Sequence, residues 1–267
     1  MRAVYDVMGI ASECGFPYST LSHLQSLNTI LGSKQSDYTK AKVSAKPKVR
    51  SRSKRHLGIT ASERPAMTFQ QELSSWWAPK GQEVAQAPSI GDKAPTVEKL
   101  QVNSGTSTII LFLRHCGCPF AEKTFLNLRE TAKAHKNLDF IAVSHSSEEA
   151  TNSWLKSLPQ AGSEPSNLRI VVDDKSEIYA AWGLGPSSYA HVLSPSSMYE
   201  AWRLGKEEGI WNRPTESGSR WQTSGYFAVD SKGVVRWGGA AKRADDMPDF
   251  EEAARAAEIG IKDEAKL

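Results

Sequence analysis

The sequence predicts an α/β protein of three layers, in which helices cover both faces of a central sheet, preceded by a disordered basic arm. Two observations predict this class. Over residues 88–260, short apolar runs typical of buried strands alternate with segments whose apolar residues recur at helical spacing. Residues 1–66 are instead rich in Ser, Lys and Arg and show no sustained period. We therefore divide the chain into a disordered extension (1–66), an N-terminal helix with a linker (67–87) and one folded domain (88–260).

Composition is typical of an intracellular globular protein. Apolar residues make up 39% of the 267 residues, which is enough for a core, and three cysteines are too few for a disulfide framework. No apolar run approaches the roughly 20 residues that a membrane-spanning helix needs. We expect a cytoplasmic protein. Asp6 and Glu13 weaken the alternative, a mitochondrial location, without excluding it.

Charge is distributed unevenly along the chain. Residues 1–66 carry a net charge of about +7, whereas the rest of the chain carries about −4. Such a basic arm suits a targeting peptide, a nucleic-acid or membrane contact, or a solvated extension. We interpret it as a solvated extension, and we expect no nucleic-acid partner.

Removal of residues 1–66 is expected to leave stability undiminished, because this composition cannot bury apolar surface. Thermal unfolding of a chain that starts at Met67 checks this expectation. A large drop in melting temperature relative to the full chain would refute it.

The predicted elements follow one another in a regular order after Met67. Phe69, Leu73 and Trp77 share one helix face, and Pro79 ends that helix. Beyond it we expect strands at 109–113, 138–144 and 168–172, each followed by a helix, then an irregular segment at 183–224, a hairpin at 225–239 and a last helix from about 248.

This order, a βαβ half followed by a ββα half, predicts a thioredoxin-like α/β/α sandwich. The irregular segment at 183–224 is rich in Gly, Ser, Pro and Trp. It is longer than a plain connection needs, which indicates a function or an insertion into the domain.

Two of the three cysteines lie where the first core strand gives way to its helix. Chemistry in open α/β sheets gathers beyond the carboxyl ends of strands, and Cys116 and Cys118 lie there. If Pro119 is the first helical residue, Cys118 is the N-cap, an exposed position where the first-turn amides and the helix dipole favour an anionic sulfur. Arg114 adds positive charge. The alternatives are inert buried thiols, or a zinc site with His115 that lacks a recognisable fourth ligand; we expect no metal and no other cofactor.

Further candidate residues come from the segment before the hairpin. In a thioredoxin-like fold the first hairpin strand faces the active thiol, and Arg220 and Gln222 precede it. We expect these two residues to contact the substrate, together with Arg114 and His115. His145 ends the second strand at the same edge of the sheet, where it is either a base or a structural histidine.

Two segments of the chain resemble a known family. FLRHCGCPFAEKTFLNL and RWQTSGYFAVDSKGVVRW resemble the peroxiredoxin-like 2 family of the alkyl hydroperoxide reductase/thiol-specific antioxidant superfamily, and its fungal members most. IGDKAP resembles the opening of many peroxiredoxins. The resemblance spans about residues 88–258, and it implies a thioredoxin fold with a redox thiol at Cys118.

The chain departs from that pattern in three ways. Ala121 stands where the second cysteine of a CxxC would be, His115 stands where typical peroxiredoxins carry threonine, and no cysteine follows Cys118. The sulfenic acid formed on Cys118 is therefore resolved either by Cys116 or by an external thiol such as glutathione or thioredoxin. We favour the external thiol, because a strand-end Cys116 points away from an N-capping Cys118.

Two functions follow from these observations. The first is a thiol-dependent oxidoreductase that reduces peroxides or disulfides, which the N-capping cysteine favours. The second is a non-catalytic thioredoxin-fold binding or accessory protein, for example in a fungal biosynthetic pathway, which the missing threonine and missing CxxC favour. The sequence leaves the natural substrate and the oligomeric state open.

Overall fold

The computed structural model describes residues 83–102, 105–192, 194–214 and 217–264. All of these residues belong to one compact unit. The predicted disordered arm and the predicted helix that carries Phe69 and Trp77 lie outside the described residues. Within the described part of the chain, no helix is both long and apolar enough to cross a membrane.

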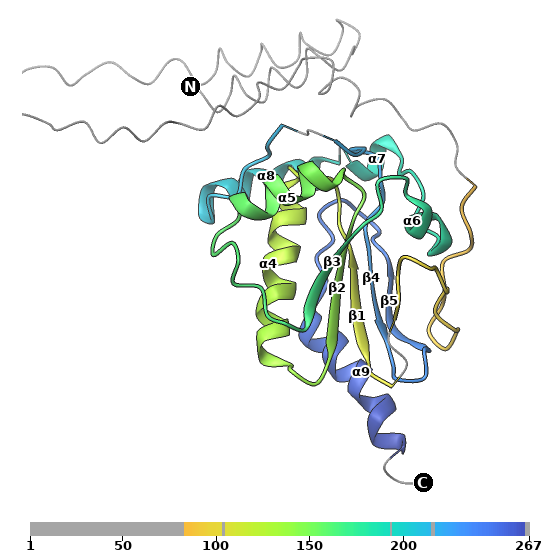
Figure 1. Ribbon diagram of the computed structural model, residues 1–267. Coiled ribbons are helices and arrows are strands. Elements are labelled where there is room, and N and C mark those ends of the chain that lie inside the picture. Colours follow the sequence, from red (N-terminus) through yellow and green to blue (C-terminus); the bar gives the residue numbers. More distant parts are fainter. Residues whose placement is uncertain (1–82, 103–104, 193, 215–216, 265–267) are drawn as a thin grey trace, which may run out of the picture. The chain divides into compact units, whose positions relative to one another are not determined.

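A five-stranded mixed sheet forms the centre of the domain (Figure 1). Three strands run parallel, and a hairpin pairs antiparallel with the first of them. In spatial order the strands are β3 (Leu168–Val172), β2 (Asp139–Ser144), β1 (Thr108–Phe112), β4 (Gly225–Val229) and β5 (Val235–Ala240). The βαβ half and the ββα half therefore meet where β1 pairs with β4, and the predicted thioredoxin-like α/β class is confirmed.

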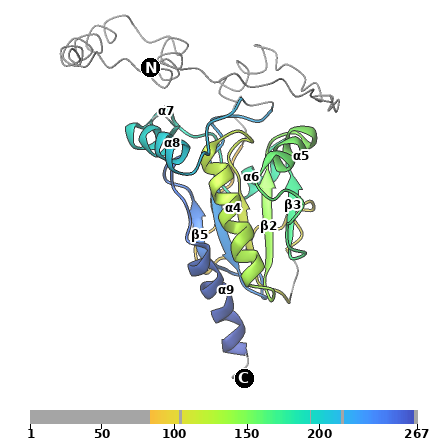
Figure 2. The same ribbon diagram turned by 90° about the vertical axis from the view of Figure 1, so that its left-hand side faces the viewer.

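The alternation of β1 explains why helices cover both faces of the sheet. Ile109 and Leu111 belong to the core on one face, and Ile110 and Phe112 belong to the core on the other. Four fully buried apolar side chains in a row suit a strand that is covered on both sides. The first face carries α4 (Pro119–Ala134), α5 (Glu148–Ser157) and α9 (Phe250–Glu264), of which α4 and α9 stand before the sheet in Figure 2.

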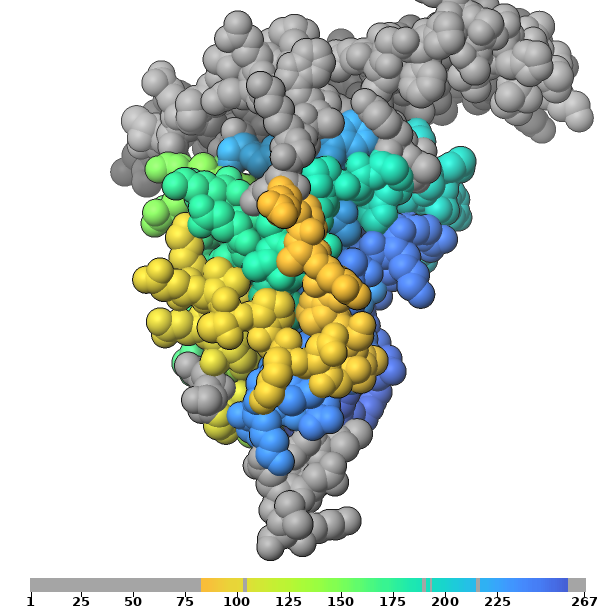
Figure 3. Space-filling model, turned by 90° about the vertical axis from the view of Figure 1, so that its right-hand side faces the viewer, coloured from red at the N-terminus to blue at the C-terminus, as the bar shows by residue number. Residues whose placement is uncertain are grey.

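The second face is covered by a short helix and by the first described segment. The helix α6 (Glu177–Ala181) buries Ile178 and Tyr179 against the sheet, and Leu100 joins the same core. Figure 3 shows the segment 83–102, in orange and yellow, running over this face beside α6. Asp173 caps α6, since its carboxylate accepts from the backbone amides of residues 177–179 at 2.8–3.1 Å.

The prediction of an irregular segment at 183–224 is wrong in its middle, where α7 (Tyr189–Val192) and α8 (Pro195–Glu207) lie. The signals for the start of α8 are ordinary, because Ser194 accepts from Ser197 N at 3.1 Å and Pro195 opens the helix. The spacing of its apolar residues does not show one buried face, because large apolar side chains also lie on its solvent-exposed side. Leu204 is buried, whereas Met198, Tyr199 and Trp202 are exposed.

Candidate functional site

The loop His115–Cys118 connects β1 to the helix α4. Cys118 is the N-cap of α4 and Pro119 opens the helix, as predicted. The Cys118 side chain makes no capping hydrogen bond. The loop is tight, because Cys118 N donates to His115 O at 3.0 Å and Gly117 has φ +132°, a region that favours glycine. The loop is therefore held in place by its backbone, and the Cys118 sulfur is not engaged in capping the first turn of α4.

Both thiol residues are buried, which corrects the expectation of an exposed thiol. Cys116 is 7% exposed and Cys118 is 5% exposed, and both belong to the core on the α4 face. The chain that follows α8 crosses the loop, since Arg213 N donates to Gly117 O at 2.9 Å. An N-cap position predicts exposure only when no distant segment packs over it.

Cys116 is turned towards a group of hydroxyls at the end of β2 and in α5. Its Sγ lies 3.6 Å from Ser144 Oγ and 3.9 Å from Thr151 Oγ1, and these two oxygens are 2.8 Å apart. The backbone amide of Cys116 donates to Ser146 Oγ at 3.3 Å. Cys116 thus sits in a polar niche of its own between β2 and α5.

Two buried arginines lie beside the loop. Arg114 is 4% exposed and Arg220 is 5% exposed, and Arg114 Nη2 donates to Arg220 O at 2.9 Å. Within the described residues, Arg114 Nε and Nη1 have no hydrogen-bond partner. Arg114 also borders a cavity of about 10 Å³ against Phe120 and Ala121 in the first turn of α4. A guanidinium stays charged when buried, so this region favours an anion.

The two histidines of the site are neutral at pH 7. Burial, followed by the positive charges of Arg220 and Arg114, holds the pKa of His115 well below its usual value. Burial lowers the pKa of His145 to about 4. His145 Nε2 lies 3.1 Å from Ser219 O, and since a carbonyl only accepts, Nε2 carries the proton and donates. Nε2 is therefore not available as a base for Cys118.

The stability of the fold is expected to fall as the pH drops from about 6.5 to 4. His145 has a folded-state pKa of about 4, below its ordinary 6.5, so the unfolded chain takes up a proton in this window that the native protein does not. The loss reaches about 1.4 kcal/mol per pH unit for one such group, and stability is fully present above the window. Urea unfolding at several pH values measures it. His145→Gln should flatten the slope, and an unchanged slope in that variant would contradict the account.

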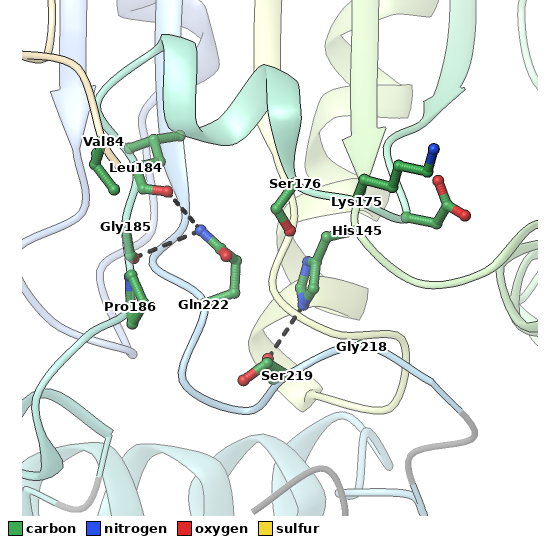
Figure 4. A pocket seen from close by; sticks show the side chains of 11 residues that line it. Val84, His145, Lys175, Ser176, Leu184, Gly185, Pro186, Gly218, Ser219 and Gln222 are labelled. Atoms are coloured by element: carbon green, nitrogen blue, oxygen red, sulfur yellow. Dashed lines mark hydrogen bonds between the residues drawn. The ribbon is translucent and has the colours of Figure 1, made fainter. Parts of the chain in front are cut away.

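Gln222 lies in the wall of a separate cavity of about 280 Å³. Its Nε2 donates to Leu184 O at 2.7 Å, so the amide is fixed by the backbone that follows α6. Figure 4 shows Gln222 on one side of the cavity and His145 on the other, with Ser176 between them. The structure therefore brings Arg114, His115, Cys116, Cys118 and Arg220 together, and it places Gln222 in this second cavity.

Sequence reasoning missed several residues that surround the thiols. Ser144 ends β2 at the same sheet edge as the cysteines, and this position was the one available signal for it. Thr151 and Arg213 gave no signal, because their contacts with the loop come from α5 and from the chain after α8.

Among known proteins, the chain is similar only to solved structures, in a comparison of folds. No protein-family model matches the chain, and no curated protein matches it. The chain is similar to a peroxiredoxin-like protein from Aquifex aeolicus, with 15% identity and a TM-score of 0.45 over 66% of this chain and 90% of that one. It is also similar to AhpC of Mycobacterium tuberculosis, with 16% identity and a TM-score of 0.40 over 67% of this chain and 96% of that one. A third similar structure is a putative thiol:disulfide interchange protein DsbE from Chlorobium tepidum, with 16% identity and a TM-score of 0.38 over 64% of this chain and 99% of that one.

Proposed function

We propose that this chain is a thiol-dependent oxidoreductase of the peroxiredoxin-like 2 type, which reduces peroxides or disulfides through the thiolate of Cys118. The observation that carries the proposal is the position of Cys118 at the N-cap of α4, on the loop that follows the buried Arg114. Backbone amides at a helix start, the helix dipole and nearby guanidinium groups all stabilise an anionic sulfur.

The chemistry requires few groups from the protein. The thiolate attacks one peroxide oxygen, so that an S–O bond forms and the O–O bond breaks. The sulfur is oxidised by two electrons to a sulfenic acid, and the other oxygen leaves as hydroxide or alkoxide and takes a proton from water. Arg114 Nε and Nη1 are the donors that we assign to the developing negative charge, because both are buried and lack a partner within the described residues.

The catalytic cycle closes with an external thiol such as glutathione or thioredoxin. Its sulfur condenses with the sulfenic acid and releases water, and a second thiol then cleaves the mixed disulfide and regenerates Cys118. Cys116 is the alternative resolving thiol. Its contacts with Ser144 and Thr151 support the external route, since they hold the Cys116 sulfur against the end of β2 and against α5.

A non-catalytic binding role is the second candidate, and the cavity of about 280 Å³ favours it. Its lining combines apolar walls, including Leu184 and Pro186, with the polar side chains of His145, Ser176 and Gln222. Such a mixture suits a small organic ligand. An accessory protein of a biosynthetic pathway would use this cavity and leave the thiols unused.

Peroxide consumption separates the two candidates. The purified full chain is mixed with hydrogen peroxide and either glutathione or a thioredoxin system, and peroxide loss is followed over time. The proposal expects consumption that is catalytic in protein and dependent on the thiol. A rate no greater than that of the reductant alone would leave the binding role as the better account.

A further inference from the structure

The backbone of Arg213 and Pro214 lies directly over the residue between the two cysteines. Arg213 N donates to Gly117 O at 2.9 Å. A Cβ added to Gly117 would lie 2.9 Å from Arg213 O and 3.0 Å from Pro214 O, so no side chain fits between the loop and these carbonyls. Two consecutive residues of the chain after α8 thus form a cover over the Cys116–Cys118 loop.

The side chain of Arg213 fastens this cover to both neighbouring helices. Its Nη2 pairs with the carboxylate of Glu122 in the first turn of α4, and its Nη1 donates to Ser157 Oγ at the end of α5 at 2.5 Å. The Glu122 side chain is 6% exposed. Separation of this pair would leave the buried carboxylate without a counter-charge, which costs free energy, so the pair holds the cover against α4.

Further hydrogen bonds hold the chain beyond the cover to the same edge of the sheet. Ser146 Oγ donates to Ser217 O at 3.2 Å, and Ser147 N donates to Ser217 Oγ at 2.5 Å. Ser146 Oγ also accepts from the backbone amide of Cys116, so these contacts reach the loop at Cys116, whereas the Arg213 contacts reach Gly117 and the helix that begins after Cys118. Arg213 is therefore the side chain best placed to control access to the thiols.

A covered thiol discriminates between its two classes of oxidant by size. Attack on hydrogen peroxide needs a molecule of two heavy atoms to reach the sulfur. In the reaction with a protein disulfide, the Cys118 thiolate attacks one sulfur of the disulfide, a new S–S bond forms, the old one breaks and the other sulfur leaves as a thiolate. The three sulfur atoms must lie in line, and the two sulfur atoms of the disulfide are attached to a polypeptide. Because Cys118 is only 5% exposed, that approach requires a larger movement of the cover than the approach of a small peroxide does.

We propose that Arg213 determines the specificity of the site by size, because it holds the cover closed on α4 and α5 and thereby admits small peroxides and excludes protein disulfides. The proposal rests on the thiol chemistry assigned to Cys118 above. The control of access by Arg213 can be tested without any catalytic activity.

Alkylation of the native thiols measures access directly. The third cysteine of the chain, Cys14, is first replaced by serine so that only Cys116 and Cys118 can react. In this full-length protein, the rates of Cys116 and Cys118 modification are compared for N-ethylmaleimide and for a polymer-linked maleimide, with the modified residue identified by mass spectrometry. The measured quantity is the ratio of the modification rate with the polymer-linked maleimide to the rate with N-ethylmaleimide. Arg213→Ala is expected to raise this ratio by about tenfold or more, because a charge-assisted hydrogen bond no longer opposes opening of the cover. An unchanged ratio in a folded Arg213→Ala protein would overturn the proposal.

Matched variants separate a local opening from general loss of stability. Arg203→Ala removes an arginine of α8 that pairs with Glu200 and Glu207 on its own helix, and it should leave the ratio unchanged. Ser157→Ala removes the uncharged partner of Arg213 and should give a smaller rise, which keeps the proposal testable if Arg213→Ala unfolds. The faster rate should not depend on low concentrations of urea, since local opening exposes little surface. A steep urea dependence would indicate global unfolding and count against the cover.

A kinetic comparison then tests the consequence for substrates. The rate of Cys118 oxidation by hydrogen peroxide is set against the rate of its reaction with a protein disulfide, and Arg213→Ala should raise the ratio of the disulfide rate to the peroxide rate by about tenfold. An unchanged ratio would refute selection by size. If neither protein reacts with peroxide while the alkylation ratio changes as expected, the chemistry at Cys118 is refuted and the control of access by Arg213 is upheld.

Discussion

Replacement of Cys118 by serine is expected to abolish thiol-dependent turnover, by on the order of a thousandfold or more, because a serine hydroxyl at this position is a far weaker nucleophile than a thiolate. Serine is a favourable N-cap residue, so α4 and the fold should persist in this variant. The loss therefore reports on chemistry, and circular dichroism together with the melting temperature verifies the fold. Peroxide consumption with glutathione or thioredoxin as reductant gives the rate.

Cys116→Ser is the matched control for this variant. Its thiol lies beside Ser144 and Thr151, and a hydroxyl in the same niche can keep these polar contacts. We expect Cys116→Ser to retain most of the turnover. Unchanged turnover in Cys118→Ser, or a loss confined to Cys116→Ser, would remove Cys118 from the catalytic assignment.

Phe112→Ala is expected to lower the free energy of unfolding by about 3–5 kcal/mol, the usual cost of emptying a phenylalanine site in a core. Phe112 is fully buried in β1, and its ring centroid lies 5.1 Å from that of Tyr179, 5.5 Å from Trp182 and 6.0 Å from Phe227. These rings come from β4 and from α6 and its end, so the cavity would weaken the whole second face of the sheet. Urea unfolding followed by tryptophan fluorescence measures the change.

Phe112→Leu provides the comparison, since it keeps most of the apolar volume and should cost far less than the alanine variant. Because Phe112 ends β1 just before the loop that carries Cys118, the thiols of the alanine variant are also expected to react with maleimides over a wider spread of rates than those of the unmodified protein. A loss of less than about 1 kcal/mol in Phe112→Ala would contradict the central place of this ring in the core.

The strands and the site loop were predictable because their signals are local. The run Ile109–Leu113 is apolar at every position, which indicates a strand buried on both faces. Pro119 after Cys118 indicates the start of α4, and the N-cap position of Cys118 follows from it. The resemblance at the cysteines supplied the expectation of redox chemistry, which is still a proposal.

The misses have physical causes that no short pattern carries. The helix α8 was missed because Met198, Tyr199 and Trp202 are exposed, so its apolar residues do not mark one buried face. The burial of Cys118 was missed because it comes from tertiary packing. Cys118 belongs to the core on the α4 face, and Arg213 reaches Gly117 and Glu122 beside it from the far end of the segment predicted to be irregular. Long-range packing of this kind overrides the exposure that an N-cap position suggests.

The most direct test of the account is the site of the first oxidation product. The protein with Cys14→Ser is treated with one equivalent of hydrogen peroxide in the presence of a sulfenic-acid trap and analysed by peptide mass spectrometry. The account predicts one trapped oxygen on Cys118, present in Cys116→Ser and absent in Cys118→Ser. Oxidation confined to Cys116, a Cys116–Cys118 disulfide seen as a loss of two hydrogens in place of the trapped product, or no oxidation faster than that of free cysteine would contradict it.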